Sequence, residues 1–153
     1  MWIARRTDYA TRAVLLLALM DDDEPVKLDE IARRTAVPRS VLEQIMPLLR
    51  SAGLVRSERG PSGGYRLNKA PDEITMERVV RIFQGQLAPI GCATRSEPEP
   101  CEMTVGCALR GVWEDVRDAT IAILRSTTFA DLAARSGGPW TDPGLLEIGG
   151  LRQ

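Results

Sequence analysis

The sequence of 153 residues contains no histidine, three cysteines and few aromatic residues, which make up 5% of the chain. Without histidine, a metal site here has to be completed by cysteine thiolates together with a carboxylate, a backbone group, a small molecule or water. The scarcity of aromatic residues predicts a core of mainly aliphatic side chains. The longest apolar run, Ala13 to Met20, is far shorter than the roughly 20 residues of a membrane-spanning helix. We therefore expect no membrane partner and a cytoplasmic location.

Positive charge is concentrated in one part of the chain. The net charge is −1, but residues 1–70 hold 12 basic and 9 acidic side chains, whereas residues 71–153 hold 8 and 12. Residues 33–69 hold eight basic side chains against two acidic ones. A local basic excess is typical of a surface that contacts the phosphate backbone of nucleic acid. Taken alone it is weak support, because most charged stretches are simply solvated.

The spacing of apolar residues predicts three helices in the first third of the chain. An amphipathic helix is expected from Tyr9 to Met20, a short one over 28–35, and a third that starts at Pro38 and stops at Gly53. Pro47 inside the third helix removes one backbone hydrogen bond and is expected to bend the axis there.

Two short alternating segments, 54–59 and 65–69, flank the sequence GPSGG and predict a β-hairpin. The glycine-rich turn lacks the Gly-Lys-Ser/Thr ending of a phosphate-binding loop and leads into a strand, so nucleotide binding is not expected. Helix, short helix, turn, helix and hairpin together predict a winged helix-turn-helix domain over residues 1–84. The alternative is a small α+β domain without a DNA-binding role.

The third predicted helix has two unlike faces. Apolar residues line one side, and Ser40, Glu43 and Gln44 share the other at the spacing of one helical face. Glutamine can pair with adenine and glutamate with the cytosine amino group in the major groove. Arg59 lies at the tip of the hairpin, where an arginine suits a narrow minor groove.

The second half of the chain predicts a helix capped by Thr75 and ended by Gly85, an irregular loop over 85–107, and helices over 108–135. A long apolar stripe runs along the helix that begins at Ala108. We expect this stripe to form a dimerisation surface. The alternative is that it packs on its own domain. Residues 136–153, rich in glycine, are expected to form a loosely held tail.

The three cysteines all lie in the irregular loop. Eight residues separate Cys92 from Cys101, and five separate Cys101 from Cys107. Thiolates on such a loop can hold an iron-sulfur cluster, zinc or copper(I). The spacing matches neither zinc ribbons nor bacterial ferredoxins. A zinc site closed by Glu99 and three reduced thiols without metal therefore stand as alternatives.

These segments resemble a known family of bacterial regulators. DYATRAVLLLAL, SVLEQI followed by AGLV, RGPSGGY, the cysteine triplet and CALRGVWEDVRDA are similar to the iron-sulfur, nitric-oxide and iron-responsive repressors of the IscR, NsrR and RirA type. The resemblance implies a mainly α fold with a β-hairpin wing, a winged helix-turn-helix domain and a long dimerisation helix. It also implies a homodimer that holds a [4Fe-4S] or [2Fe-2S] cluster through Cys92, Cys101 and Cys107.

The same resemblance assigns the DNA contacts. It implies that Ser40, Glu43 and Gln44 face the major groove and that Arg59 enters the minor groove. Arg39 and Arg50 are expected to contact phosphates, which position the protein without reading sequence.

The fourth cluster ligand is where the sequence departs from part of the family. Some members have a histidine three residues after the last cysteine, and this chain has Arg110 there. In the nitric-oxide-sensing branch an aspartate from the partner subunit fills the place, and Asp8 stands at the matching position. The alternative is that Asp8 is an ordinary surface charge in the first turn of its helix.

The sequence as a whole predicts a DNA-binding transcriptional repressor that is not an enzyme. It is expected to bind a palindromic operator as a homodimer and to respond to iron, redox state or nitric oxide through a cluster. A thiol-based redox regulator without metal is the main alternative. No cofactor fingerprint or catalytic acid–base set supports an enzyme that uses a cluster.

Overall fold

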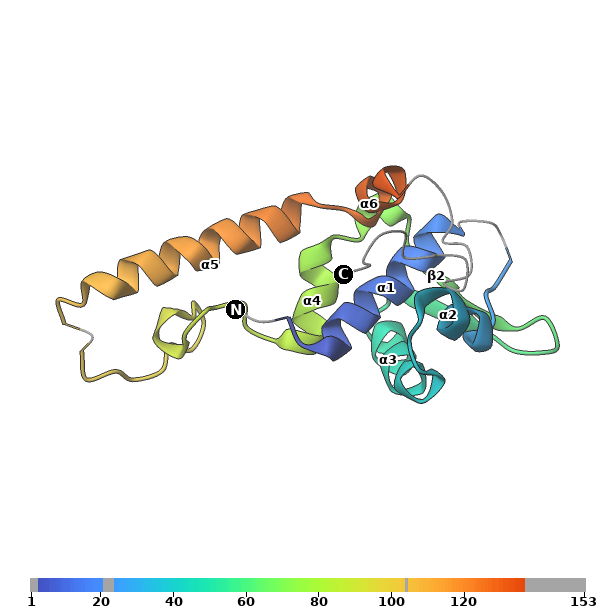
Figure 1. Ribbon diagram of the computed structural model, residues 1–153, viewed down its shortest axis with the longest axis horizontal. Coiled ribbons are helices and arrows are strands. Elements are labelled where there is room, and N and C mark those ends of the chain that lie inside the picture. Colours follow the sequence, from blue (N-terminus) through green and yellow to red (C-terminus); the bar gives the residue numbers. More distant parts are fainter. Residues whose placement is uncertain (1–2, 21–23, 104, 137–153) are drawn as a thin grey trace, which may run out of the picture.

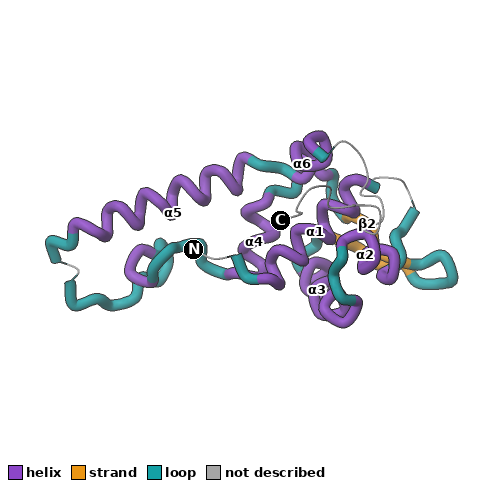
Figure 2. Tube along the Cα trace, in the orientation of Figure 1, coloured by secondary structure: helices purple, strands orange, loops and turns teal. Residues whose placement is uncertain are grey.

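The computed structural model describes residues 3–20, 24–103 and 105–136. Figure 2 shows a mainly helical chain with one two-stranded sheet, as the sequence predicts. The elements in chain order are α1 (Arg5–Leu19), α2 (Leu28–Thr35), α3 (Arg39–Ser51), β1 (Val55–Glu58), β2 (Gly64–Leu67), η1 (Pro71–Glu73), α4 (Met76–Gln84), η2 (Gly91–Ala93), α5 (Ala108–Ser126) and α6 (Phe129–Arg135). The predicted tail over 136–153 lies outside the described residues, apart from its first residue.

The core is built around α1, which contacts α2, α3, α4 and α6. Its inward side chains are small or aliphatic, and Ala10, Ala13 and Leu16 are completely buried. Phe129, at the start of α6, closes the core and is also completely buried. The aliphatic core predicted from composition is confirmed, and burial of these side chains is the main force that holds the helices together.

The wing is an antiparallel hairpin in which Val55 pairs with Leu67 and Glu58 with Gly64. A third segment joins it, because the backbone of Val26 exchanges two 2.8 Å hydrogen bonds with that of Tyr65. Gly64 lies where β2 meets the segment that contains Val26, and a Cβ at this position would overlap the carbonyl group of Val26. The wing is therefore attached to the segment that enters α2.

Helix α4 begins as predicted, with the Thr75 hydroxyl accepting a 3.3 Å hydrogen bond from the Arg78 amide. After α4 the chain forms the cysteine loop and returns through α5. Figure 1 shows α5 extending away from the helical domain as an arm, with the loop running alongside it. The end of α5 is tied to α4, since the Met76 amide donates to the Thr127 carbonyl at 2.9 Å.

Two details differ from the sequence prediction. Helix α1 starts at Arg5 rather than Tyr9, because its first turn is fixed from outside: the Thr7 hydroxyl donates a 3.0 Å hydrogen bond to the Gln84 side chain at the end of α4. In the loop, which was expected to be irregular throughout, Gly91–Ala93 forms a 3₁₀ turn. Among the described residues, no helix is long and apolar enough to cross a membrane.

Candidate DNA interface and cysteine loop

The third helix presents its polar residues to solvent. Leu42, Ile45 and Leu49 are completely buried against the core, whereas Ser40, Glu43 and Gln44 are exposed. Helix α3 continues through Pro47 to Ser51. The structure therefore brings the three predicted base-reading residues together on one accessible face.

Arg39 connects this face to α2. Its guanidinium donates a 3.0 Å hydrogen bond from Nε to the Glu43 carboxylate and a second one to Asp29. The pKa of Arg39 is raised, first by the hydrogen bond to Asp29 and then by that to Glu43. In the free protein Arg39 is therefore paired with Glu43 and Asp29. A DNA phosphate that binds Arg39 would have to compete with these two carboxylates.

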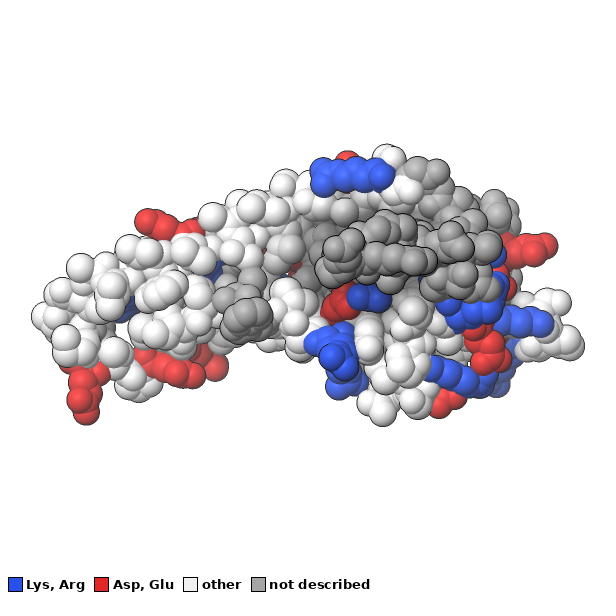
Figure 3. Space-filling model, viewed as in Figure 1, with Lys and Arg blue, Asp and Glu red and all other residues white. Residues whose placement is uncertain are grey.

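The remaining predicted DNA contacts, Arg50 and Arg59, lie near the wing. Arg50, at the end of α3, donates a 3.2 Å hydrogen bond to the Ser57 hydroxyl in β1. Arg59 is exposed in the turn that joins the two strands. Figure 3 shows basic side chains on the part of the molecule that contains α2, α3 and the wing, whereas the face of the arm seen in this view is mostly uncharged, with acidic groups at its edge. The charge division of the sequence is therefore also a division in space.

The three cysteines differ in their surroundings. Cys92 is half-buried in η2, Cys101 is exposed, and Cys107 is half-buried at the residue that precedes α5. No three Cys, Asp or Glu side chains are placed together as a metal site within the part of the chain that the structure describes. The donor set of three thiols fits a cluster, but the loop would have to close for these thiols to converge.

Asp8 is not grouped with the cysteines of its own chain. It lies in the first turn of α1, where its carboxylate forms an ion pair with the Arg12 guanidinium at 2.7 Å. The Asp8 side chain remains 42% exposed. It lines an open groove at the base of the arm, formed with apolar side chains that include Val80 and Leu124. This location leaves the carboxylate accessible to a second molecule.

Helix α5 carries an apolar stripe that the described part of the chain leaves exposed. The apolar side chains are exposed by 37% to 66%: Leu109, Val112, Trp113, Val116 and Ile123. On another side of the helix, Arg117 is buried against the loop and Ile121 is buried with Val80 and Leu87. The alternative that the stripe packs on its own domain is thereby contradicted for these five residues.

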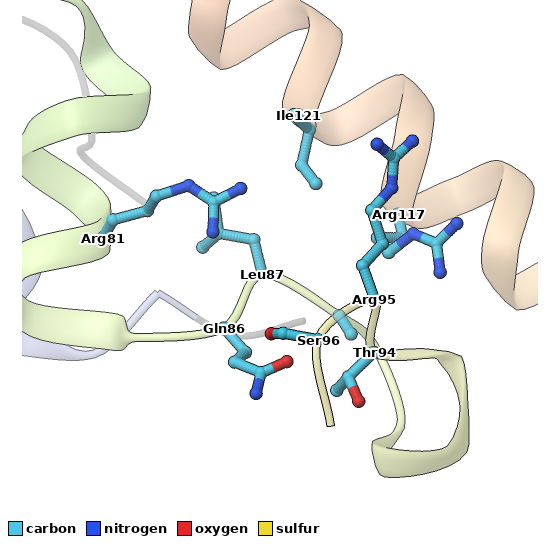
Figure 4. Close-up of a pocket in the computed structure, with 9 residues that line it drawn as sticks. Arg81, Gln86, Leu87, Thr94, Arg95, Ser96, Arg117 and Ile121 are labelled. Atoms are coloured by element: carbon cyan, nitrogen blue, oxygen red, sulfur yellow. The ribbon is translucent and has the colours of Figure 1, made fainter. Parts of the chain in front are cut away.

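Sequence reasoning missed the charged residues that attach α5 to the rest of the chain. Glu77 in α4 is 8% exposed and Arg117 in α5 is 9% exposed. Figure 4 shows Arg117 and Arg95 beside a small pocket of about 40 Å³, with Arg81 entering from α4 on the other side. The burial of Arg117 could have been predicted from its position, because Arg117 and the apolar Ile121 are four residues apart and lie on the same side of the helix.

These features define a winged-helix transcriptional regulator with a cysteine-containing loop. The residue pattern of the Rrf2 family, described as iron-dependent transcriptional regulators, matches residues 3–135. The chain belongs to the Rrf2 family.

Several known proteins are similar to the chain over most of its length. An rrf2-like helix-turn-helix regulator from Rhodobacter capsulatus is 36% identical over 143 residues, which cover 90% of this chain and 95% of the relative. IscR of Photobacterium profundum is 34% identical over 124 residues, covering 81% and 70%. The structure of CymR, the global cysteine regulator of Bacillus subtilis, has a TM-score of 0.77 at 34% identity and covers 88% and 98%. IscR of T. potens has a TM-score of 0.72 at 29% identity and covers 89% and 88%.

Proposed function

We propose that this protein is a dimeric transcriptional repressor whose grip on a palindromic operator in the cytoplasm is controlled by an iron-sulfur cluster in the loop 85–107. The observation that carries the proposal is the position of three cysteines on one irregular loop that leads directly into α5. That helix presents an uncovered apolar surface for a second subunit. A change in the conformation of the loop would therefore alter the position of α5 and the contact between the two subunits.

Reading of DNA is assigned to α3 and the wing. Ser40, Glu43 and Gln44 are exposed on one face and suit the edges of bases in the major groove. Arg59 at the wing tip suits the minor groove. Arg39 and Arg50 lie at the two ends of α3 and are proposed to hold phosphates, which fix the register of the helix on the duplex.

Dimer formation is assigned to the exposed stripe of α5. Five large apolar side chains on one helical face cost free energy in water, and burial against the same face of a second copy would remove that cost. Two copies related by a two-fold axis would present two α3 helices to the two halves of a palindrome.

The cluster is assigned to Cys92, Cys101 and Cys107, with Asp8 of the partner subunit as the fourth ligand. A bound cluster supplies a centre that is sensitive to iron supply, oxidants and nitric oxide. The chain's own part is to close the loop around three thiolates and to present a carboxylate that is accessible at the base of the arm. A ligand from each subunit would couple the loop of one to α1 of the other.

The test is anaerobic purification followed by an absorption spectrum, iron and sulfide counts, and binding to a palindromic fragment with and without the cluster. Cluster absorbance, lost on substitution of the cysteines, and a change in operator affinity on cluster loss are expected. In Asp8→Ala the cluster should persist but should be removed faster by chelators. Iron-free protein from both anaerobic preparation and reconstitution, with unchanged operator binding, would contradict the proposal.

A metal-free thiol regulator is the second candidate. The similarity to CymR, a global regulator of cysteine rather than of iron, favours it. So does the open placement of the three thiols within the described residues. The same iron and sulfide counts separate the two candidates, because a thiol regulator contains neither. The thiol regulator further requires that oxidation of the iron-free protein changes its operator affinity.

A further inference from the structure

The turn that carries Cys92 is unusually well fixed for part of an exposed loop. The Ala93 amide donates to the Ile90 carbonyl at 3.1 Å, and the amides of Thr94 and Glu99 both donate to the Gly91 carbonyl, at 3.2 and 3.1 Å. Ala93 is completely buried. By contrast, Cys101 is exposed, and Val105, between the other two cysteines, is 99% exposed.

One side chain from outside the loop holds this turn. The guanidinium of Arg117, near the middle of α5, donates a hydrogen bond from Nη1 to the carbonyl of Ala93, the residue that follows Cys92. Arg117 is 9% exposed. Burial of a charged group costs free energy unless the group is paired and hydrogen-bonded. The hydrogen bonds of Arg117 must therefore compensate for its lost contacts with water.

Asp118 aims the guanidinium and adds a second connection to the loop. Its carboxylate accepts from Nε of Arg117 at 2.7 Å and from Nη2 of Arg95 at 2.9 Å. The pKa of Asp118 is lowered to about 2, first by Arg117 and then by Arg95, so the carboxylate is charged throughout the physiological range. Two consecutive residues of α5 thus bind the loop on both sides of Thr94, at Ala93 and at Arg95. Figure 4 shows Arg117 on α5 beside Thr94 and Arg95 of the loop.

We propose that Arg117 is a positioning residue that fixes the Cys92 thiol against α5 before any metal is bound. Cys107 is joined to the same helix directly, as the residue that precedes it. Two of the three thiols are therefore positioned relative to α5. The inference rests on the proposed function for its biological meaning, but the positioning itself is a property of the metal-free chain.

The consequence concerns how the loop acts on the arm. A change at Cys92 is transmitted to α5 through the Arg117 side chain, across the loop, rather than along the 14 residues that separate Cys92 from Cys107. Oxidation or ligand exchange at the turn would therefore displace the middle of α5, where the exposed face carries Val116. This holds both for a cluster and for a thiol switch.

The test is the rate of iodoacetamide labelling of each cysteine in the reduced, metal-free, full-length protein. Trypsin separates Cys92, in the peptide 82–95, from Cys101 and Cys107, which share the peptide 96–110, and fragmentation of the shared peptide assigns the label to one cysteine or the other. In Arg117→Met the apolar side chain retains the packing volume but loses the hydrogen bonds. We expect labelling of Cys92 to become about tenfold faster, the factor that corresponds to loss of a hydrogen bond to a charged group, with Cys101 unchanged.

Arg110→Met is the matched control. Arg110 lies on the same helix and binds Glu114 through Nε at 2.9 Å, in the same way as Arg117 binds Asp118, and the labelling rate of Cys92 should not change. Asp118→Asn, at a half-exposed site that tolerates the change, should give a smaller acceleration in the same direction. This second variant keeps the test decisive if Arg117→Met does not fold.

Equal Cys92 labelling in wild type, Arg117→Met and Asp118→Asn would overturn the inference. Failure of the proposed function has a different signature, because absence of iron leaves the labelling ratio unaffected. Where a cluster is obtained, Arg117→Met should shorten its lifetime against a chelator while Arg110→Met does not. An unchanged lifetime in Arg117→Met would also count against the positioning role.

Discussion

Arg125, at the end of α5, donates two hydrogen bonds to the buried carboxylate of Glu77 in α4, from Nε at 2.8 Å and from Nη2 at 3.2 Å. Arg81 donates to the same carboxylate at 2.8 Å. The Phe129 amide, just beyond the arm, donates to the Ile74 carbonyl at 2.9 Å. The arm is therefore attached at its base to α4, the helix that packs on α1.

Neutralising Glu77 should destabilise the protein. In Glu77→Gln the two arginines lose their charged partner while the site stays buried, and we expect a loss of about 1–3 kcal/mol in unfolding free energy. Glu114→Gln is the control, because Glu114 forms a more exposed pair with Arg110 on the arm and should change stability by less than about 0.5 kcal/mol. Urea denaturation measures both. Equal losses of unfolding free energy in the two variants would show that the burial of Glu77 does not increase its contribution to stability.

Glu77 also makes stability depend on acid. Its pKa is lowered from 4.5, first by the hydrogen bond from Arg125. A carboxylate with a lower pKa in the folded state stabilises fully above its unfolded pKa, and that contribution is lost as pH falls through the folded pKa. The unfolding free energy should therefore fall as pH drops below 4.5. Glu77→Gln should flatten this decline in part, because Asp118, whose pKa is also lowered, adds a decline at lower pH.

The close contact at Gly64 gives a test of how the wing is attached. Gly64→Ala places a methyl group against the backbone of Val26, and the required shift should cost about 1–3 kcal/mol and weaken operator binding by displacing the wing. Gly111→Ala is the opposite case. Gly111 lies inside α5 with open space around it, so alanine should stabilise by about 0.5–1 kcal/mol. Thermal unfolding and DNA titration distinguish these outcomes.

Two residues of the DNA-binding surface should behave differently on substitution. If Gln44 contacts a base as proposed, Gln44→Ala should cost about 1–3 kcal/mol on the preferred operator and much less on unrelated DNA. If Arg50 contacts a phosphate as proposed, Arg50→Ala should weaken binding to all sequences alike and reduce the salt dependence by about one unit of slope. Fluorescence anisotropy over a salt series measures both. A uniform effect of Gln44→Ala would remove it from the base-reading set.

Much of the fold could be predicted because its helices repeat apolar residues at helical spacing. The stripe along α5 and the buried side of α3 follow directly from residue order, and Thr75 caps α4 as its hydroxyl suggests. The start of α1 could not be predicted in this way, since Thr7 and Gln84 meet across 77 residues. Contacts of this kind depend on tertiary packing, which apolar periodicity does not encode.

The candidate site was predictable in composition but not in arrangement. The cysteines and the polar residues of α3 could be identified by type and spacing. Arg117 and Glu77 could not, because charged residues are usually exposed and their partners lie 24 and 48 residues away, at Ala93 and Arg125. The attachment of the loop to α5 therefore emerges from the structure alone.

The proposed dimer surface can be tested with two glutamates on one helix. Val116 lies within the exposed apolar stripe of α5, whereas Ala122 is exposed on a different side of the same helix. If a second subunit covers the stripe, Val116→Glu buries an unpaired charge in each subunit and should raise the dimer dissociation constant by about 100-fold, equivalent to about 3 kcal/mol. Ala122→Glu, with the same charge and a similar helix propensity, should leave the constant unchanged. Sedimentation over a concentration series measures the effect, and operator affinity should fall in parallel for Val116→Glu because a monomer contacts one half-site. A dimer that survives Val116→Glu would place the subunit contact elsewhere.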